Sequence, residues 1–156
     1  MDQTASATAG SADGTHITLP CQFCEKWNRV DASKAAQRPK CGECGKPILL
    51  DRPFMLTGAT FARVIADSEV PVLVDFYADW CGPCKQMAPA VDEMARRHEG
   101  RALIAKLNTD HAPQVSQDFG IRGIPTSIVF RLGKESARQV GAVPLAGLEA
   151  LLSSIP

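Results

Sequence analysis

The sequence lacks an excess of charge of either sign. Its 156 residues include 17 Lys and Arg against 17 Asp and Glu. A chain without a global field does not attract nucleic acid or an anionic membrane by net charge, so such binding would need a local patch. The length predicts one ordinary domain with room for a small second module, and 45% hydrophobic residues are enough to form a core.

Long apolar runs are also missing. The most apolar stretch, residues 70–78, is interrupted by Asp75 and is far shorter than the ~20 apolar residues of a membrane-spanning helix. Residues 1–19 contain no Lys or Arg and no apolar block, so they lack the features of a secretory signal. We therefore expect no transmembrane helix and a cytoplasmic location. Residues 1–18, rich in Ala, Ser, Thr and Gly at their start, are predicted to be a flexible leader.

Cysteine is present in a distinctive arrangement. The six cysteines form three C-x-x-C pairs, which are Cys21 with Cys24, Cys41 with Cys44, and Cys81 with Cys84. In a reducing compartment three structural disulfides are not expected. Metal binding and redox catalysis are therefore the leading interpretations.

The chain divides into two modules after the leader. Residues 19–52 have few large apolar side chains, and a stretch of this size is below the ~40 residues that usually hold together without a metal, a disulfide or a partner. Residues 53–156 alternate apolar strands with amphipathic helices, which is typical of an α/β layered domain. We predict strands at 70–78, 102–108, 127–132 and 135–140, a possible short strand before the first helix, and helices at 57–67, after Cys84, at 111–119 and from Pro144 onward.

The pair Cys81 and Cys84 is predicted to be redox-active. Two cysteines three residues apart at a helix start can close a disulfide with little backbone movement. The helix N-terminus favours the thiolate of Cys81, the predicted nucleophile, whereas Cys84 lies one turn inside and is the predicted resolving thiol. Pro83 suits the first helical turn, and Gly82 allows another polypeptide to approach. Half of a zinc site is the alternative, but the preceding β-branched strand and following helix favour redox chemistry.

The stretch Val-Asp-Phe-Tyr-Ala-Asp-Trp-Cys-Gly-Pro-Cys-Lys at residues 74–85 closely resembles the active-site stretch of the thioredoxin family. The resemblance covers residues 53–156 and includes Gly-Ile-Pro-Thr at 123–126 and Val-Gly-Ala at 140–142, while Tyr77 stands where many members carry Trp. It implies a thioredoxin fold, a central mixed sheet flanked by helices. It also implies a protein-disulfide reductase, disulfide-containing client proteins, an NADPH-dependent thioredoxin reductase and no bound organic cofactor.

Asp75 and Lys106 are candidate catalytic residues. Asp75 interrupts an apolar strand, where loss of hydration would raise its pKa and suit it to proton exchange; an exposed strand face is the alternative. The resemblance places Asp75 behind the cysteine pair as a general acid/base for Cys84. It also places the Lys106 ammonium near this carboxylate, although an outward surface lysine remains an alternative.

The resemblance also implies a cis-proline loop and a substrate surface. Base rates favour a trans peptide bond before a generic proline, but the similarity of residues 123–126 to the family's loop implies cis at Pro125. This loop would face the cysteines and offer the Ile124 backbone to an added strand of substrate. The predicted substrate-binding residues are Trp80, Gly82, Pro83, Ile124, Pro125, Gly141 and Ala142. For Trp80, plain core packing is the alternative.

The remaining four cysteines predict a zinc site. Cys21, Cys24, Cys41 and Cys44 follow the spacing C-x2-C, sixteen residues, C-x2-C, which is typical of a four-cysteine zinc site. Such a site would hold one structural Zn²⁺ with no open coordination position. Two additional dithiol pairs without metal are the alternative. An N-terminal zinc ribbon joined to this type of domain resembles the bacterial thioredoxin-2 subgroup.

Three functions compete on these grounds. The first is general protein-disulfide reduction through Cys81 and Cys84. The second is a binding module in which the ribbon recruits a partner. Nucleic acid is disfavoured as that partner, because the seven basic residues of the ribbon are nearly balanced by its four acidic residues and by about two further negative charges of a zinc tetrathiolate. The third is a redox sensor that releases zinc when its thiolates are oxidised.

Overall fold

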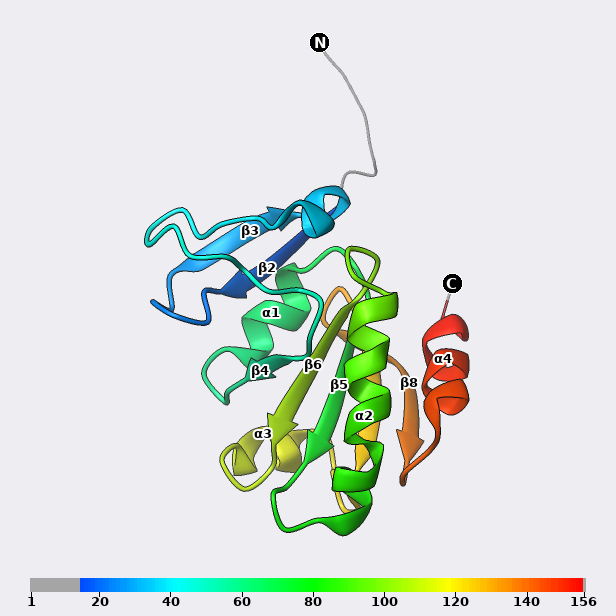
Figure 1. Ribbon diagram of the computed structural model, residues 1–156. Helices are drawn as coiled ribbons and strands as arrows, with labels where there is room; N and C mark the ends of the chain where they lie inside the picture. Colours follow the sequence, from blue (N-terminus) through cyan, green and yellow to red (C-terminus); the bar gives the residue numbers. More distant parts are fainter. Residues whose placement is uncertain (1–14, 156) are drawn as a thin grey trace.

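The computed structural model describes residues 15–155 and contains two β-sheets (Figure 1). The first sheet pairs two short strands, and the second has five strands with helices on both faces. The elements in chain order are β2 (His16–Pro20), β3 (Trp27–Asp31), the 3₁₀ helix η1 (Ala32–Gln37), β4 (Phe54–Leu56), α1 (Phe61–Asp67), β5 (Val72–Tyr77), α2 (Gly82–Arg97), β6 (Leu103–Asn108), α3 (Pro113–Asp118), β7 (Thr126–Arg131), β8 (Lys134–Val140) and α4 (Leu145–Ser153).

The five-stranded sheet has the order β4-β6-β5-β7-β8. Strands β4, β6 and β5 run parallel, β7 runs antiparallel to β5, and β8 runs antiparallel to β7. Side chains of β5 alternate between the two faces. Val72, Val74 and Phe76 pack toward α1 and α3, whereas Leu73 packs toward α2 and α4. This mixed sheet flanked by helices confirms the predicted α/β architecture.

Two helices begin later than the sequence pattern predicts. α1 begins at Phe61 rather than residue 57, because Thr57 and Thr60 exchange backbone-to-hydroxyl hydrogen bonds of 2.9 and 3.2 Å in a turn that precedes it. α3 begins at Pro113 rather than residue 111, with proline in its first turn. Within residues 15–155, no helix combines the length and apolar character required to cross a bilayer.

The two-stranded sheet includes residues that were predicted to belong to the leader. Residues 16–18, predicted as the end of a flexible leader, belong to β2, which pairs antiparallel with β3. The alternation of Ile17 and Leu19, both fully buried, gives this short segment an inward face. The rest of the predicted leader, residues 1–14, lies outside the described residues.

Residues 16–52, which we call the ribbon, pack against the part of the chain that forms the larger sheet. The amide of Thr18 donates to the hydroxyl of Ser68 at 3.1 Å, and the backbone N–H of Glu69 donates to the carbonyl of His16 at 2.8 Å. Ile17, Leu19 and Val30 belong to the same hydrophobic cluster as α1 and the sheet. These contacts lie before the start of β5, and Figure 1 shows the ribbon at the end of the sheet opposite the start of α2.

Candidate active site and metal centre

Cys81 and Cys84 form a disulfide at the N-terminus of α2, with their Cα atoms 5.2 Å apart. Cys81 is the N-cap residue, and its sulfur accepts a 3.2 Å hydrogen bond from the backbone N–H of Cys84. An N–H donor and the positive end of the helix both stabilise negative charge on this sulfur when the disulfide is reduced. Cys84 lies on the buried stripe of α2 that continues with Met87 and Val91 toward the sheet.

Asp75 is buried in the middle of β5, as the sequence predicted. Asp75 is 0% exposed. Desolvation raises the pKa of its carboxyl to about 6, although the positive charge of Lys106 lowers this pKa in part. Asp75 shares its sheet face with Leu73, two residues earlier, which packs against α2. The carboxyl therefore lies on the face covered by the helix that carries Cys84, where it can exchange a proton near neutral pH.

Lys106 lies opposite Asp75 in the register of β6 and β5 and is partly exposed. Its ammonium is 4.4 Å from the centroid of the Tyr77 ring, a cation–π contact. Its charge acts on Asp75, while its terminal group rests on an aromatic face.

The predicted substrate-binding residues come from three segments of the chain, one of them the start of α2, that meet near Cys81. The Ile124–Pro125 peptide bond is cis, and the Cys81 sulfur lies 3.8 Å from the carbonyl oxygen of Ile124. The backbone N–H of Gly141 donates to the carbonyl of Pro125 at 2.8 Å, which brings the third loop alongside. Gly82, Pro83 and Ala142 are exposed and Ile124 is partly buried.

Trp80 is a surface residue and not a core residue. It is 70% exposed, and its indole N–H donates to the carboxylate of Asp110 at 2.9 Å. Asp110 is in turn held by its backbone N–H, which donates to the side chain of Asn108 at 2.9 Å. The indole is therefore oriented beside Cys81 with most of its surface available for contact.

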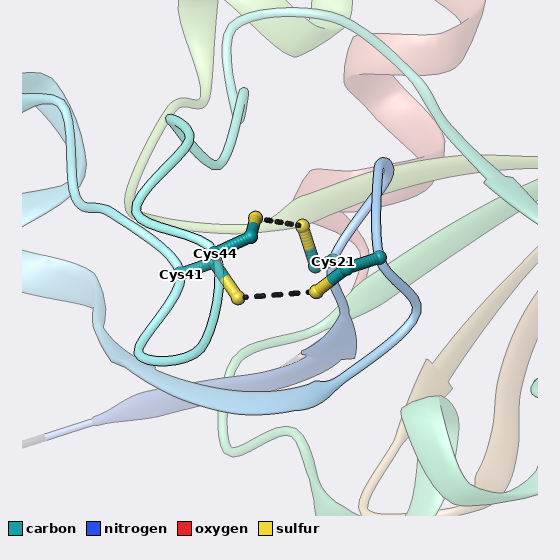
Figure 2. Close-up of side chains that lie close together, drawn as sticks. Cys21, Cys41 and Cys44 are labelled. Carbon is teal, nitrogen blue, oxygen red and sulfur yellow. Dashed lines mark hydrogen bonds between the residues drawn. The ribbon is translucent and has the colours of Figure 1, made fainter.

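The four ribbon cysteines converge as predicted. Figure 2 shows the side chains of Cys21, Cys41 and Cys44 pointing toward one another from two loops. All four sulfurs lie within 4.8 Å of one another, with Cys21 and Cys44 3.7 Å apart and Cys24 and Cys41 3.6 Å apart. A tetrahedron with Zn–S bonds of about 2.3 Å has edges of about 3.8 Å. The donor set and its spacing therefore fit a zinc ion.

Each C-x-x-C pair sits in the same kind of turn. The N–H of Cys21 donates to Lys26 O and that of Glu25 to Cys21 O, and the second turn repeats this pattern with Cys41, Lys46 and Gly45. Gly45 has a φ of 75° and Glu25, at the same place in the first turn, has 67°. The first turn has no glycine at this position. Glu25 adopts the left-handed conformation that glycine adopts more easily.

Asn28 is a functional residue that the sequence reasoning missed. Its side-chain amide donates to Lys26 O at 2.8 Å and to the Cys41 sulfur at 3.4 Å, and its oxygen accepts from the N–H of Gly42 at 3.0 Å. It thus links the two turns. The backbone N–H of Cys44, followed by Asn28 and the N–H of Glu43, lowers the pKa of the Cys41 thiol to about 6, which favours the thiolate that a metal requires. A single asparagine on β3 carries no spacing signal that could have marked it.

Two family models match separate parts of the chain. The model described as Thioredoxin matches residues 52–154, and the model described as Thioredoxin 2, N-terminal matches residues 20–46. The first covers the five-stranded sheet with its helices and the Cys81–Cys84 pair. The second covers the four clustered cysteines.

Curated proteins and solved structures agree with these matches. Thioredoxin 1 of a Nostoc species is 50% identical over 97 residues, covering 62% of this chain and 91% of that protein. Thioredoxin C-3 of Corynebacterium nephridii is 37% identical over 136 residues, covering 87% and 93%. A mutant thioredoxin from Halobacterium salinarum NRC-1 superposes with a TM-score of 0.62 at 34% identity, covering 68% of this chain and 92% of that one.

Proposed function

Because the chain belongs to the thioredoxin family and is a thiol–disulfide oxidoreductase, we propose that it is a general protein-disulfide reductase that reacts through Cys81 and Cys84. The observation that carries this proposal is the disulfide between these residues at the N-terminus of α2, bordered by the exposed indole of Trp80. A disulfide beside an exposed aromatic surface suits exchange with other polypeptides.

The reduced pair would act in two steps. The thiolate of Cys81 attacks one sulfur of a client disulfide, so that a Cys81–client bond forms, the client's own S–S bond breaks and its freed sulfur takes a proton. Cys84 then attacks the Cys81 sulfur, the Cys81–Cys84 bond forms and the client's second sulfur leaves. The client gains two electrons, and an NADPH-dependent thioredoxin reductase returns two to the pair.

Asp75 would serve the second step as a general base. Cys84 must lose its proton to attack, and the buried carboxyl, with a pKa of about 6, is mostly ionised at neutral pH yet close enough to that pH to release the proton again. The Lys106 ammonium would favour the ionised form. We assign to Trp80, Gly82, Pro83, Ile124, Pro125, Gly141 and Ala142 the surface that holds an extended client segment.

We assign one Zn²⁺ to Cys21, Cys24, Cys41 and Cys44, with a structural role. The ion would supply a cross-link between two turns that have little apolar burial of their own. Cys24 and Cys44 are exposed, which supports a second role as a redox sensor. Release of zinc by peroxide before any loss of Cys81 reactivity would favour that role.

We further propose that the ribbon ends at residue 52 and that residues 53–156 form the catalytic domain. Disulfide-containing proteins and the reductase are its partners, with no part for nucleic acid or membrane. The cytoplasm is the compartment in which the four ribbon cysteines would stay reduced and able to hold metal.

Reduction of insulin disulfides tests this function. With NADPH and thioredoxin reductase, the protein should reduce insulin catalytically, and Cys81→Ser should abolish turnover. Cys84→Ser should also stop turnover but accumulate a covalent mixed disulfide with the client, because the resolving thiol is gone. Failure of the unaltered protein to reduce insulin under these conditions would contradict the proposal.

A further inference from the structure

A row of four polar side chains crosses the sheet at the level of Asp75. The strand register places Lys106 of β6 and Ser127 of β7 opposite Asp75, and Gln139 of β8 opposite Ser127. Directly opposite residues point to the same face of a sheet. The equivalent row two residues away is apolar and packs under α2, with Ile104, Leu73 and Val129. The polar row therefore also faces the side of the sheet that α2 covers.

The two central members of this row are buried without partners. Asp75 and Ser127 are both 0% exposed, and within residues 15–155 neither the two carboxyl oxygens nor the Ser127 hydroxyl has a hydrogen-bond partner. Their Cβ atoms are about 5 Å apart at opposite positions of an antiparallel pair, which a hydroxyl and a carboxyl can bridge. A buried polar group left unpaired is destabilising, so each is the natural partner of the other.

We propose that Ser127 is a positioning residue for Asp75: rotation of these two side chains from their positions in the structure joins the hydroxyl to the carboxyl, and the hydroxyl then hydrogen-bonds it in both protonation states. This inference rests on the proposed role of Asp75 in the resolving step. When Asp75 is ionised, the hydroxyl donates to it; when Asp75 has taken the proton from Cys84, the hydroxyl accepts from the neutral carboxyl. A hydroxyl can do both because it carries a donor and acceptor lone pairs.

The other polar groups on this face of the described sheet cannot take this part. The hydroxyl of Tyr77, two residues along β5, is hydrogen-bonded to the side chain of Asn108. Lys106 on β6 can only donate, and its ammonium rests on the ring of Tyr77. Cys84 on α2 is the proton donor itself and is held in the disulfide when oxidised. Gln139 on β8 lies beyond Ser127 and donates to Val140 O at 3.0 Å. Ser127 is therefore the adjacent neutral group that can donate to the ionised carboxyl and accept from the protonated one.

Direct titration of the Asp75 carboxyl tests the proposal without reliance on turnover. In oxidised protein labelled with ¹³C-aspartate, Ser127→Ala should move the Asp75 titration midpoint upward by about one pH unit, because the ionised form loses a donor. Ser127→Thr, which retains a hydroxyl, should restore the midpoint. Ser136→Ala removes an exposed hydroxyl from β8 and is the matched control. An unchanged midpoint in Ser127→Ala, or equal shifts in the Ala and Thr variants, would overturn the inference.

Two further measurements separate this inference from the proposed function. In the unaltered protein the ¹³Cβ resonance of Ser127 should change with the same midpoint as the Asp75 carboxyl, whether or not a variant folds; an independent or absent change contradicts the inference. The pH profile of mixed-disulfide resolution should shift upward in Ser127→Ala but not when Asp75→Asn is also present. If the protein failed to reduce insulin but Ser127 and Asp75 titrated together, the proposed function would be rejected and the Ser127–Asp75 pairing would be retained.

Discussion

Asp75 is a residue whose negative charge the fold opposes. It is enclosed by the sheet and α2, and this burial outweighs the attraction of Lys106, so its pKa rises to about 6 from the ordinary 3.8. A carboxyl kept in this condition reduces stability, and in the proposed function it serves as the proton acceptor for Cys84. The loss of stability appears only when the carboxyl is ionised, so it can be measured from the free energy of unfolding as a function of pH.

We expect the stability of the oxidised protein to fall between about pH 4 and pH 7 because of Asp75. In this window the folded chain still binds the proton that the unfolded chain has released, so the free energy of unfolding decreases as pH rises. The shift of about two pH units corresponds to about 3 kcal/mol. Urea unfolding should therefore show Asp75→Asn gaining about 3 kcal/mol on the unaltered protein from pH 4 to pH 8.

The exposed Asp92 offers the control for this measurement. Asp92→Asn should follow the unaltered protein across the whole range. A stability difference between Asp75→Asn and the unaltered protein that stays constant with pH would mean that the carboxyl is hydrated in the folded state.

At the scale of elements, η1 of the ribbon packs on the loop between α2 and β6. Gly100 in that loop has a φ of 83°, and a Cβ built on it would lie 2.6 Å from the carbonyl oxygen of Ala32 and 3.2 Å from the Cβ of Ala35. The backbones of the two modules thus approach more closely than any side chain allows. This contact fixes η1 against the end of the sheet.

Gly100→Ala should destabilise the protein by about 3 kcal/mol, from backbone strain and from displacement of η1. Gly120 has a φ of 62° but open space around it, so Gly120→Ala should cost only the strain, about 1 kcal/mol. Denaturant unfolding of both variants gives the difference. Equal losses would show that η1 shifts without cost.

The sequence could predict features that depend on local spacing. The cysteine pairs, the burial of Asp75 among apolar neighbours and the strands of the larger sheet all follow from residues close together in the chain. It could not predict that Ser127 faces Asp75, because this depends on the register between two strands, and the two residues are 52 positions apart in the chain. The same applies to Gly100, whose neighbours lie in another module. β2 was missed because only Ile17 and Leu19 carry its alternation.

At the scale of the whole molecule, the ribbon and the larger sheet share one hydrophobic cluster. Ile17 and Leu19 from β2 and Val64 from α1 are all fully buried in it. Glu69 adds a polar link between the two modules. Its carboxylate accepts hydrogen bonds from the backbone N–H of His16 at 2.8 Å and from Arg29 at 3.0 Å, both in the ribbon. Its carbonyl accepts a hydrogen bond from Arg131 of β7 at 3.1 Å. Two modules joined in this way are expected to unfold together.

Removal of zinc should therefore weaken the entire protein. In calorimetry, the metal-loaded chain should unfold in a single transition. A chelator should lower the midpoint of this transition by roughly 10 °C, because several kcal/mol of metal-binding free energy is lost and ~1 kcal/mol shifts the midpoint of a chain of this size by a few degrees. Added Zn²⁺ should restore the midpoint in the unaltered protein but not in Cys24→Ala. Two separate transitions, with the higher one insensitive to metal, would contradict this coupling.

The placement of the ribbon has a practical consequence. The exposed Lys34 of η1 stands beyond the start of β6, at the opposite end of the sheet from the loops that surround Cys81. A fluorophore or a surface linker attached at this lysine would move with the metal-binding module and stay clear of docking clients. Such a tethered protein could report metal loss and reductase turnover in the same experiment.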